Sequence, residues 1–232
     1  MAKNATYWLY GQHAVQAALD NPARQVQRAL ATSKAADKIR WGKQRPELTT
    51  TDDIAKKIGG DPVHQGVALS VTALDDVHLD EVMDAPRLAI LDQVTDPQNI
   101  GAILRSAAAF GIAALILPKD NAPPETGAMA KTACGGLEMV PLVRVTNLAK
   151  CMKELKESGH WILGMDGAAK APISAARDYE KCVLVLGAEG SGMRRLTAEN
   201  CDILVKIPMQ ETMESLNVSN AAAIAFYEAF KP

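Results

Sequence analysis

Residues 183–193 read VLVLGAEGSGM. The first four form a continuous apolar run, which is typical of a strand buried on both faces of a parallel sheet. Three glycines follow within six residues, so the chain can turn there with its backbone N–H groups open to a ligand. A buried strand running into such a loop predicts an α/β domain whose ligand lies beyond the carboxyl ends of the strands.

The same pattern extends on both sides of this stretch. Strands are predicted over residues 87–91, 113–117, 140–143, 161–165 and 203–207. Helices are predicted between them over residues 100–110, 125–134, 146–158 and 214–230. Continuous apolar strands alternating with helices predict a mostly parallel sheet with helices on both faces.

The charge distribution divides the chain near residue 80. Residues 1–75 carry ten Lys/Arg and seven Asp/Glu, net +3, and contain predicted strands at 26–31 and 66–72 with predicted helices between and before them. Residues 76–86 carry four acids and no Lys/Arg, which is typical of a linker. We therefore expect a small α/β domain (1–75), an acidic linker (76–86) and a larger α/β domain (87–232).

Composition excludes several classes of protein. The 232 residues carry a net charge of −2, so a strongly basic nucleic-acid coat is excluded, although a local basic face is not. No apolar run approaches the ~20 residues of a membrane span, and the N-terminus does not resemble a secretory signal. Four cysteines and four histidines are scattered without metal-ligand spacing. We expect a cytoplasmic protein that holds no metal.

The loop over residues 92–101, DQVTDPQNIG, follows a predicted strand and opens a helix. Asn99 lies at or near the predicted N-cap, and Arg105 interrupts an otherwise apolar helix. On local sequence alone, a helix cap and a snorkelling surface cation are the favoured interpretation. A site for a phosphate-bearing ligand is the alternative.

Two further loops carry polar groups. In the glycine-rich loop, Glu189 would repel a pyrophosphate and no Lys-Ser/Thr pair follows, so a nucleoside-type ligand without phosphates fits better than ATP or NAD. The loop after residue 207 places Ser215, Asn217, Ser219 and Asn220 at the start of an apolar helix. Because such side chains compete for the backbone, several are expected to bind something other than their own helix.

Together these stretches resemble the SpoU class of the SPOUT RNA methyltransferases. The three motifs are DxVTDPxNIGAxLRSAxAFG, LVLGAEGSGM and IPMxxxxxSLNVSNA, in this order. The segments YGQHAVQAAL and HQGVAL in the first 75 residues resemble the substrate-binding extension of this class. The resemblance thus covers nearly the whole chain.

The resemblance implies a trefoil knot in the C-terminal domain, S-adenosylmethionine as methyl donor, no metal, a homodimer, and methylation of a ribose 2′-hydroxyl, with guanosine in 23S rRNA the expected substrate. The implied catalytic positions are Asn99, Arg105, Glu189, Ser215 and Asn217. The implied donor contacts are Leu186, Gly187, Ile207, Pro208, Met209 and Leu216.

Arginine is a poor base at neutral pH, so we expect Arg105 to grip the phosphate beside the target ribose, with that phosphate or water taking the proton. Asn99 and Asn217 would orient Arg105 and the ribose, and Glu189 could act as a base if desolvated. The basic side chains of the first part are interpreted as mostly solvated, with a subset lining an RNA path: Lys3, Arg24, Arg28, Lys34, Lys38, Arg40, Lys43 and Arg45.

Three alternatives remain. A methyltransferase of the same class could act on tRNA guanosine, although the N-terminal module disfavours this reading. A non-catalytic RNA-binding protein would be expected to lose Arg105 or Asn217, which are both present. A nicotinamide oxidoreductase would need a G-x-G-x-x-G turn after an early strand, and residues 92–101 do not provide it.

Overall fold

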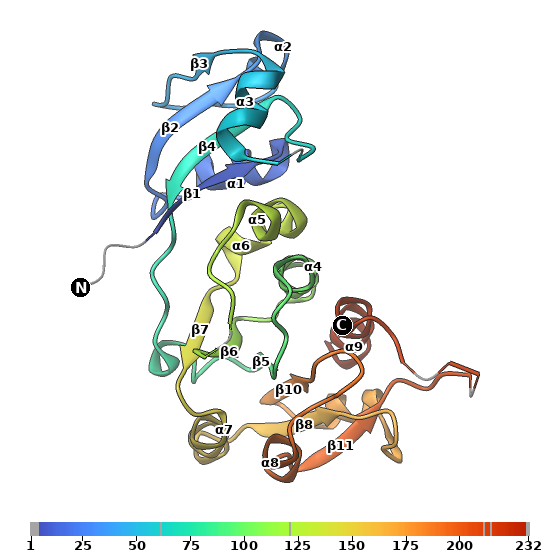
Figure 1. The fold of residues 1–232 in the computed structure, drawn as a ribbon. Coiled ribbons are helices and arrows are strands. Elements are labelled where there is room, and N and C mark those ends of the chain that lie inside the picture. Colours follow the sequence, from blue (N-terminus) through green and yellow to red (C-terminus); the bar gives the residue numbers. More distant parts are fainter. Residues whose placement is uncertain (1–4, 61, 121, 211, 214, 231–232) are drawn as a thin grey trace. The chain divides into compact units, whose positions relative to one another are not determined.

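The computed structural model describes residues 5–60, 62–120, 122–210, 212–213 and 215–230 (Figure 1). These residues form two compact units. The first contains the described residues up to Asp75 together with Pro124–Met139, and the second contains Asp76–Pro123 and the described residues from Val140 onward. Lys3 lies outside the described residues.

The first unit is built on a four-stranded mixed sheet in the order β1-β4-β2-β3. Its strands are β1 (Thr6–Tyr10), β2 (Val26–Ala31), β3 (Glu47–Leu48) and β4 (Val67–Thr72). Its helices are α1 (Gln12–Asp20), α2 (Ser33–Ala36), α3 (Thr51–Ile58), α5 (Gly127–Ala133) and α6 (Gly136–Met139). The small core joins Tyr10, Leu30, Ile54 and Ala68.

Helices α5 and α6 belong to the first unit, although their sequence lies inside the expected second domain. Gly127 meets β1 so closely that an added Cβ would lie 2.3 Å from the carbonyl oxygen of Trp8. Arg24 donates to Glu125 at 2.9 Å and to Glu138 at 2.7 Å, and all three side chains are at most 5% exposed. The interpretation of Arg24 as a solvated charge is therefore wrong, because two carboxylates of α5 and α6 enclose it.

Burial changes the acid–base behaviour of this ion cluster. Burial and the neighbouring Glu125 raise the pKa of Tyr7, whose hydroxyl donates to Glu125 Oε2 at 3.0 Å. Burial alone would lower the pKa of Arg24, but its hydrogen bonds to Glu138 and the charge of Glu125 raise it above the ordinary arginine value. The guanidinium therefore remains charged in the interior of the first unit.

The second unit contains a seven-stranded sheet in the order β7-β6-β5-β10-β8-β11-β9. Every pairing in it is parallel, so the predicted parallel sheet is confirmed. The strands are β5 (Arg87–Leu91), β6 (Leu115–Pro118), β7 (Leu142–Val145), β8 (Trp161–Met165), β9 (Ala171–Pro172), β10 (Cys182–Leu186) and β11 (Ile203–Lys206).

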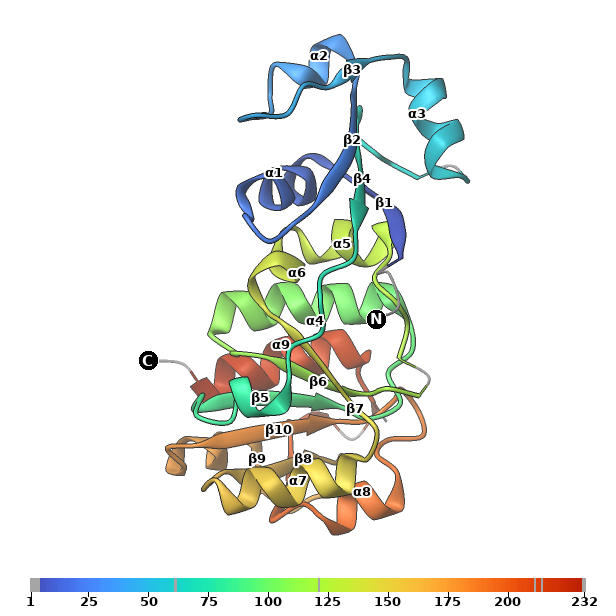
Figure 2. The ribbon, with the colours of Figure 1, turned by 90° about the vertical axis from the view of Figure 1, so that its left-hand side faces the viewer.

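Helices cover both faces of this sheet, as predicted. Figure 2 shows α4 (Pro97–Phe110) and α9 (Val218–Phe230) on one side and α7 (Leu148–Glu157) and α8 (Arg195–Glu199) on the other. Two short 3₁₀ helices complete the unit, η1 (Leu79–Glu81) and η2 (Ile173–Asp178). The acidic stretch 76–86 packs here and not between the units, because Val82 is buried in the hydrophobic core of the sheet.

Three helix starts differ from the sequence predictions. Helix α4 is capped by Asp96, whose carboxylate accepts from the Gln98 N–H, so Asn99 lies inside the first turn and is not its cap. Helix α7 begins at Leu148 with Asn147 as its cap, whereas the prediction began this helix at residue 146. Helix α9 starts at Val218, whereas the prediction placed its start at Glu214, which is outside the described residues.

The expected trefoil knot depends on the chain between β11 and α9. This segment includes Glu211 and Glu214, which lie outside the described residues, so the knot stays a prediction. Among the described residues, no helix is long and apolar enough to cross a membrane.

The four cysteines are expected to differ strongly in reactivity. Burial raises the pKa of Cys151, Cys182 and Cys201 to about 12, whereas Cys134 is exposed. Because the thiolate is the nucleophile, we expect one fast equivalent with Ellman's reagent at pH 8, and three more only after unfolding. Cys134→Ser should remove the fast phase. A second fast equivalent in the native protein would contradict this prediction.

Candidate active site

A cavity of about 370 Å³ opens at the carboxyl edge of the sheet, beside β8, β10 and β11. This volume falls within the range of small-molecule sites, about 300–1,000 Å³. Three loops converge on it, after Met165, after Leu186 and after Lys206, and the first turns of α9 close it. The cavity therefore lies where the sequence predicted a ligand.

Most of the expected donor contacts line this cavity. They are Leu186, Gly187, Ile207, Met209 and Leu216. Pro208 is not among the lining residues, although both of its neighbours are. Ser215, expected among the catalytic groups, lines the same cavity and makes no described side-chain hydrogen bond.

The glycine-rich loop closes tightly on itself. Ala188 and Gly192 exchange two backbone hydrogen bonds, of 3.0 and 2.9 Å. A Cβ on Gly187 would lie 2.1 Å from the carbonyl carbon of Gly192 and 2.3 Å from the backbone nitrogen of Met193. Only glycine fits at position 187, because the loop folds back over it.

The cavity wall suits a nucleoside without phosphates. Its side chains are largely apolar, and the glycine-rich loop, residues 187–192, brings the backbone itself to the cavity wall. Among the lining residues, Lys206 is the one cation, while Asp166 and Glu189 are acids. A polyphosphate would meet two carboxylates and one ammonium group here, whereas a cationic, phosphate-free ligand meets a favourable balance.

Three predicted catalytic residues are brought together from three loops. The Asn217 Nδ2 donates to Asn99 Oδ1 at 3.1 Å and to Glu189 Oε2 at 3.3 Å. The Asn217 Oδ1 accepts from the backbone N–H and the hydroxyl of Ser219, at 2.9 and 2.6 Å. Both ends of the Asn217 amide are thus engaged, so its orientation is fixed. We call Asn99, Glu189 and Asn217 the amide–carboxylate cluster.

Arg105 is not joined to this cluster by any described side-chain hydrogen bond or ion pair. It is exposed on α4. The expectation that the two asparagines orient Arg105 is therefore not met by any described contact. Its guanidinium is available to a partner from outside this chain.

No role was predicted from the sequence for the loop after β8. This loop lines the cavity with Met165, Asp166 and Gly167. The signal was present, because a polar Asp-Gly pair follows a predicted buried strand. Since β8 is hydrogen-bonded beside β10, its carboxyl end had to reach the same edge. Among the described residues, no group of three His, Cys, Asp or Glu could hold a metal ion.

Two family models match the chain. The model of the SpoU rRNA methylase family matches residues 86–227, and that of the RNA 2′-O ribose methyltransferase substrate-binding domain matches residues 8–77. The RlmB 23S rRNA (guanosine-2′-O-)-methyltransferase of Vibrio vulnificus is 43% identical, over 97% of this chain and 96% of the relative. The RlmB enzyme of Xanthomonas campestris is 37% identical over 97% and 96%.

Solved structures agree with these matches. The SpoU methyltransferase AviRb of Streptomyces viridochromogenes, solved in complex with the cofactor AdoMet, has a TM-score of 0.81 and 25% identity, covering 97% of this chain and 89% of that one. The resemblance seen in the three loops is thereby confirmed along the whole length. The chain belongs to the SpoU rRNA methylase family.

Proposed function

We propose that this protein transfers a methyl group from S-adenosylmethionine to the ribose 2′-hydroxyl of a guanosine in 23S rRNA. The observation that carries the proposal is the amide–carboxylate cluster at the edge of a cavity that suits a nucleoside without phosphates. Glu189 belongs to the cluster and also lines the cavity. The RlmB relatives, aligned over nearly their full length, are named for this reaction. In this proposal the second unit catalyses, and the first unit binds the RNA substrate.

The donor, when bound, supplies a methyl group on a positively charged sulfur. Gly187, Ile207 and Leu216 would hold it, with Leu186, Pro208 and Met209 beside them. The chain then has to align the attacking 2′-oxygen with that methyl group, and orientation of this kind can contribute about 7–11 kcal/mol. The fixed Asn217 amide and its partner Asn99 are placed to position the ribose.

The proton of the 2′-hydroxyl needs an acceptor. Glu189 Oε2 accepts from the Asn217 amide nitrogen at 3.3 Å, and we propose this carboxylate as the acceptor. Arg105 would grip the adjacent phosphate with its planar fork, and that phosphate or a water is the alternative acceptor. Methyl transfer by Arg105→Lys at saturating donor tests the grip on the phosphate. Lysine keeps the positive charge but cannot form the two parallel hydrogen bonds of the planar guanidinium.

Asn217→Asp is expected to lower kcat/KM by about 10²-fold while preserving the fold. Aspartate can still accept from Ser219 and cap α9, but it cannot donate to Asn99, and it places a second carboxylate beside Glu189. Methyl transfer and thermal unfolding are measured together. Asn217→Ala should lose the activity and also about 0.5–2 kcal/mol of capping. Full activity of the aspartate variant would contradict the role assigned to Asn217.

We also propose a homodimer that forms through α4 and α9, helices that pack against each other. Helix α9 leaves Ile224 42% and Tyr227 53% exposed, and Tyr227 meets Phe110 edge to face at 5.7 Å. Exposed apolar side chains on adjacent helices favour a protein interface. Arg105 on α4 would then lie close to the second subunit.

Ile224→Glu is expected to shift the protein to monomer, because it buries a charge in the proposed interface. Sedimentation velocity measures the mass, and circular dichroism checks the fold. Exposed Met139, which lies in the first unit, supplies the matched control as Met139→Glu. If Ile224→Glu and Met139→Glu have the same sedimentation coefficient, this result would argue against the interface.

Transfer of labelled methyl from S-adenosylmethionine tests the proposed function directly. The acceptors are 23S rRNA and tRNA from a strain lacking this protein, followed by nucleoside mapping. We expect 2′-O-methylguanosine in 23S rRNA. Label in tRNA alone would establish the alternative substrate, and no label in either would leave an RNA-binding protein. We also propose a cytoplasmic location, which a 23S rRNA substrate implies.

A further inference from the structure

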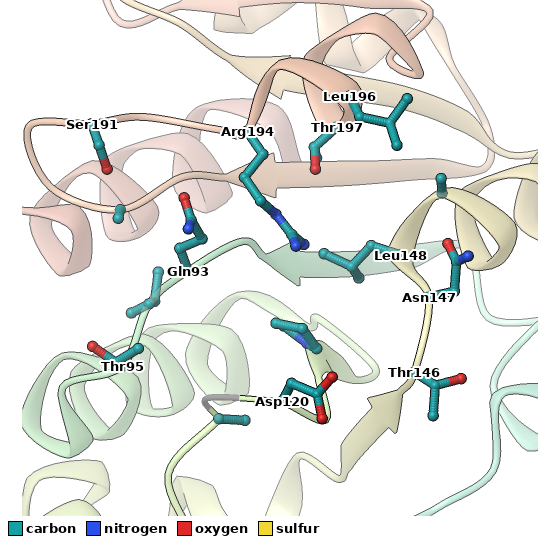
Figure 3. Close-up of a pocket in the computed structure, with 15 residues that line it drawn as sticks. Gln93, Thr95, Asp120, Thr146, Asn147, Leu148, Ser191, Arg194, Leu196 and Thr197 are labelled. Carbon is teal, nitrogen blue, oxygen red and sulfur yellow. The ribbon is translucent and has the colours of Figure 1, made fainter.

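A second, larger cavity of about 640 Å³ lies at the carboxyl edge of the same sheet (Figure 3). It is formed by the segments that follow β5, β6 and β7 and by the start of α8. It shares Ala188 and Ser191 with the first cavity, but none of the residues named above as catalytic groups or as donor contacts lines it. The cavity is therefore unassigned space in the catalytic unit.

The topology of the sheet favours a ligand at this place. Strand β5 leads into α4 on one face, while the adjacent β10 leads into α8 on the other face (Figure 2). Loops that leave neighbouring parallel strands in opposite directions open a crevice, and α/β proteins bind ligands in such crevices. The cavity of about 370 Å³ that is proposed above to hold the methyl donor lies on the other side of β10, beside β8 and β11. We call it the donor cavity.

Arg194 is held so that part of its guanidinium faces this cavity. Asp92, which is fully buried, accepts from the Arg194 backbone N–H at 2.9 Å and from Nε at 2.8 Å. Because Nε is occupied, the two terminal amino groups remain for a ligand, and Figure 3 shows them directed between the walls. A buried carboxylate thus fixes a cation that is itself half exposed.

Asp120 supplies the opposite chemistry from the opposite wall. It is exposed two residues after the end of β6, and Figure 3 shows its carboxylate across the cavity from Arg194. No described ion pair joins it to a cation. Val94, Pro118, Leu148 and Leu196 complete the walls with apolar surface. A flat ligand that accepts hydrogen bonds on one edge and donates on another fits this arrangement.

Guanine has this distribution of groups. Its O6 and N7 accept from arginine, and its N1–H and exocyclic amino group donate to a carboxylate. A phosphate would be repelled by Asp120, and adenine offers no N1–H to it. We infer that this cavity receives the guanine base of the nucleoside to be methylated, with Asp120 and Arg194 determining its specificity. The inference rests on the proposed function.

The two cavities are arranged for one nucleoside to reach both sites. Ala188 and Ser191 line the guanine cavity and also the donor cavity, so the glycine-rich loop is a shared wall. Gln93 and Thr95 line the guanine cavity just before the turn that carries Asn99. A base held here leaves its ribose beside the amide–carboxylate cluster, where the methyl group is transferred.

Replacing guanosine by inosine tests this inference, because inosine lacks only the exocyclic amino group. The substrate is a synthetic RNA fragment carrying either nucleoside at the mapped position. We expect the native enzyme to prefer guanosine about tenfold in kcat/KM. Asp120→Ala should lower both values, because each nucleoside loses its N1–H contact, and should lower the guanosine value about tenfold more, so that the preference for guanosine disappears. Asp178→Ala, an exposed acid that lines neither cavity, is the matched control.

These measurements can overturn the guanine cavity and the proposed methyltransferase function separately. An undiminished preference for guanosine in Asp120→Ala would overturn the guanine cavity while leaving the methyltransferase intact. Tighter RNA binding by Asp120→Ala with an unchanged preference would do the same and would assign the cavity to the phosphate backbone. No methyl transfer to either fragment or to whole rRNA would overturn the proposed function itself. Arg194 is not substituted, because its loss would leave Asp92 buried without a cation.

Discussion

Gly187→Ala is expected to lower the affinity for S-adenosylmethionine by about 10²-fold. The added methyl group would lie 2.1–2.5 Å from backbone atoms of Gly192 and Met193, and backbone cannot rotate away as a side-chain tip can. The loop over residues 188–192 must move outward, and that loop forms one wall of the donor cavity. Displacements of about 1 Å in a binding site can cost this much. Isothermal titration with the donor measures the effect.

Gly164→Ala is the matched control for this substitution. Its added methyl group would also be too close to its neighbours, at 2.7–2.9 Å, but these are the side-chain ends of Cys201, Met193 and Leu204. We expect it to cost about 1–3 kcal/mol of stability by overpacking, with donor affinity near that of the native protein. If both variants lose affinity equally, general loosening of the unit and not the loop wall explains the result.

Most strands of the large sheet, and the edge at which the 370 Å³ cavity opens, could be predicted from the sequence, because their causes are local. Buried parallel strands read as continuous apolar runs, and the predicted bounds 87–91 and 161–165 are those of β5 and β8. A glycine-rich turn after such a strand marks the ligand edge. The sheet brings the loops together simply because parallel strands end at the same edge.

Other features depend on contacts that no local pattern contains. Asn99 has the sequence context of a cap, yet Asp96 caps α4 and the Asn99 side chain meets Asn217, 118 residues later. Strand β1 was not predicted, and its Trp8 carbonyl meets Gly127. These partners are selected by the packing of distant segments, so the cluster was found through family resemblance and not through spacing.

The net charge of residues 1–75 overstates the number of unpaired cations in this part of the chain. Residues 1–75 carry a net charge of +3, but Arg24 is neutralised inside the first unit by acids from α5 and α6. Arg28 pairs with Glu47 and Arg40 with Asp20 at the surface. The cations left for RNA are mainly exposed side chains such as Lys34, Lys38, Lys43 and Arg45. RNA binding by this unit, as proposed above, would therefore have fewer charges available than the sequence count implies.

Arg24→Met is expected to destabilise the first unit by about 3–5 kcal/mol, because it leaves two buried carboxylates without their cation. Arg24 is fully enclosed and donates to Glu125, to Glu138 and to the carbonyl oxygen of Thr72. Chemical denaturation followed by the fluorescence of Trp8 and Trp41, which both lie in this unit, measures the change. Arg28→Met removes an exposed pair with Glu47 and should cost less than about 1 kcal/mol.

The origin of the loss can be tested by removing the carboxylates as well. If uncompensated charge causes the destabilisation, adding Glu125→Gln and Glu138→Gln to Arg24→Met should restore most of the stability, since neutral amides tolerate burial better. If packing of the guanidinium is the cause, the triple variant will be no more stable than Arg24→Met. Donor affinity should stay near the native value in Arg24→Met and in the triple variant, because every residue lining the donor cavity belongs to the second unit. A parallel loss of donor affinity would mean that α5 and α6, whose sequence connects β6 to β7, transmit the change into the catalytic sheet.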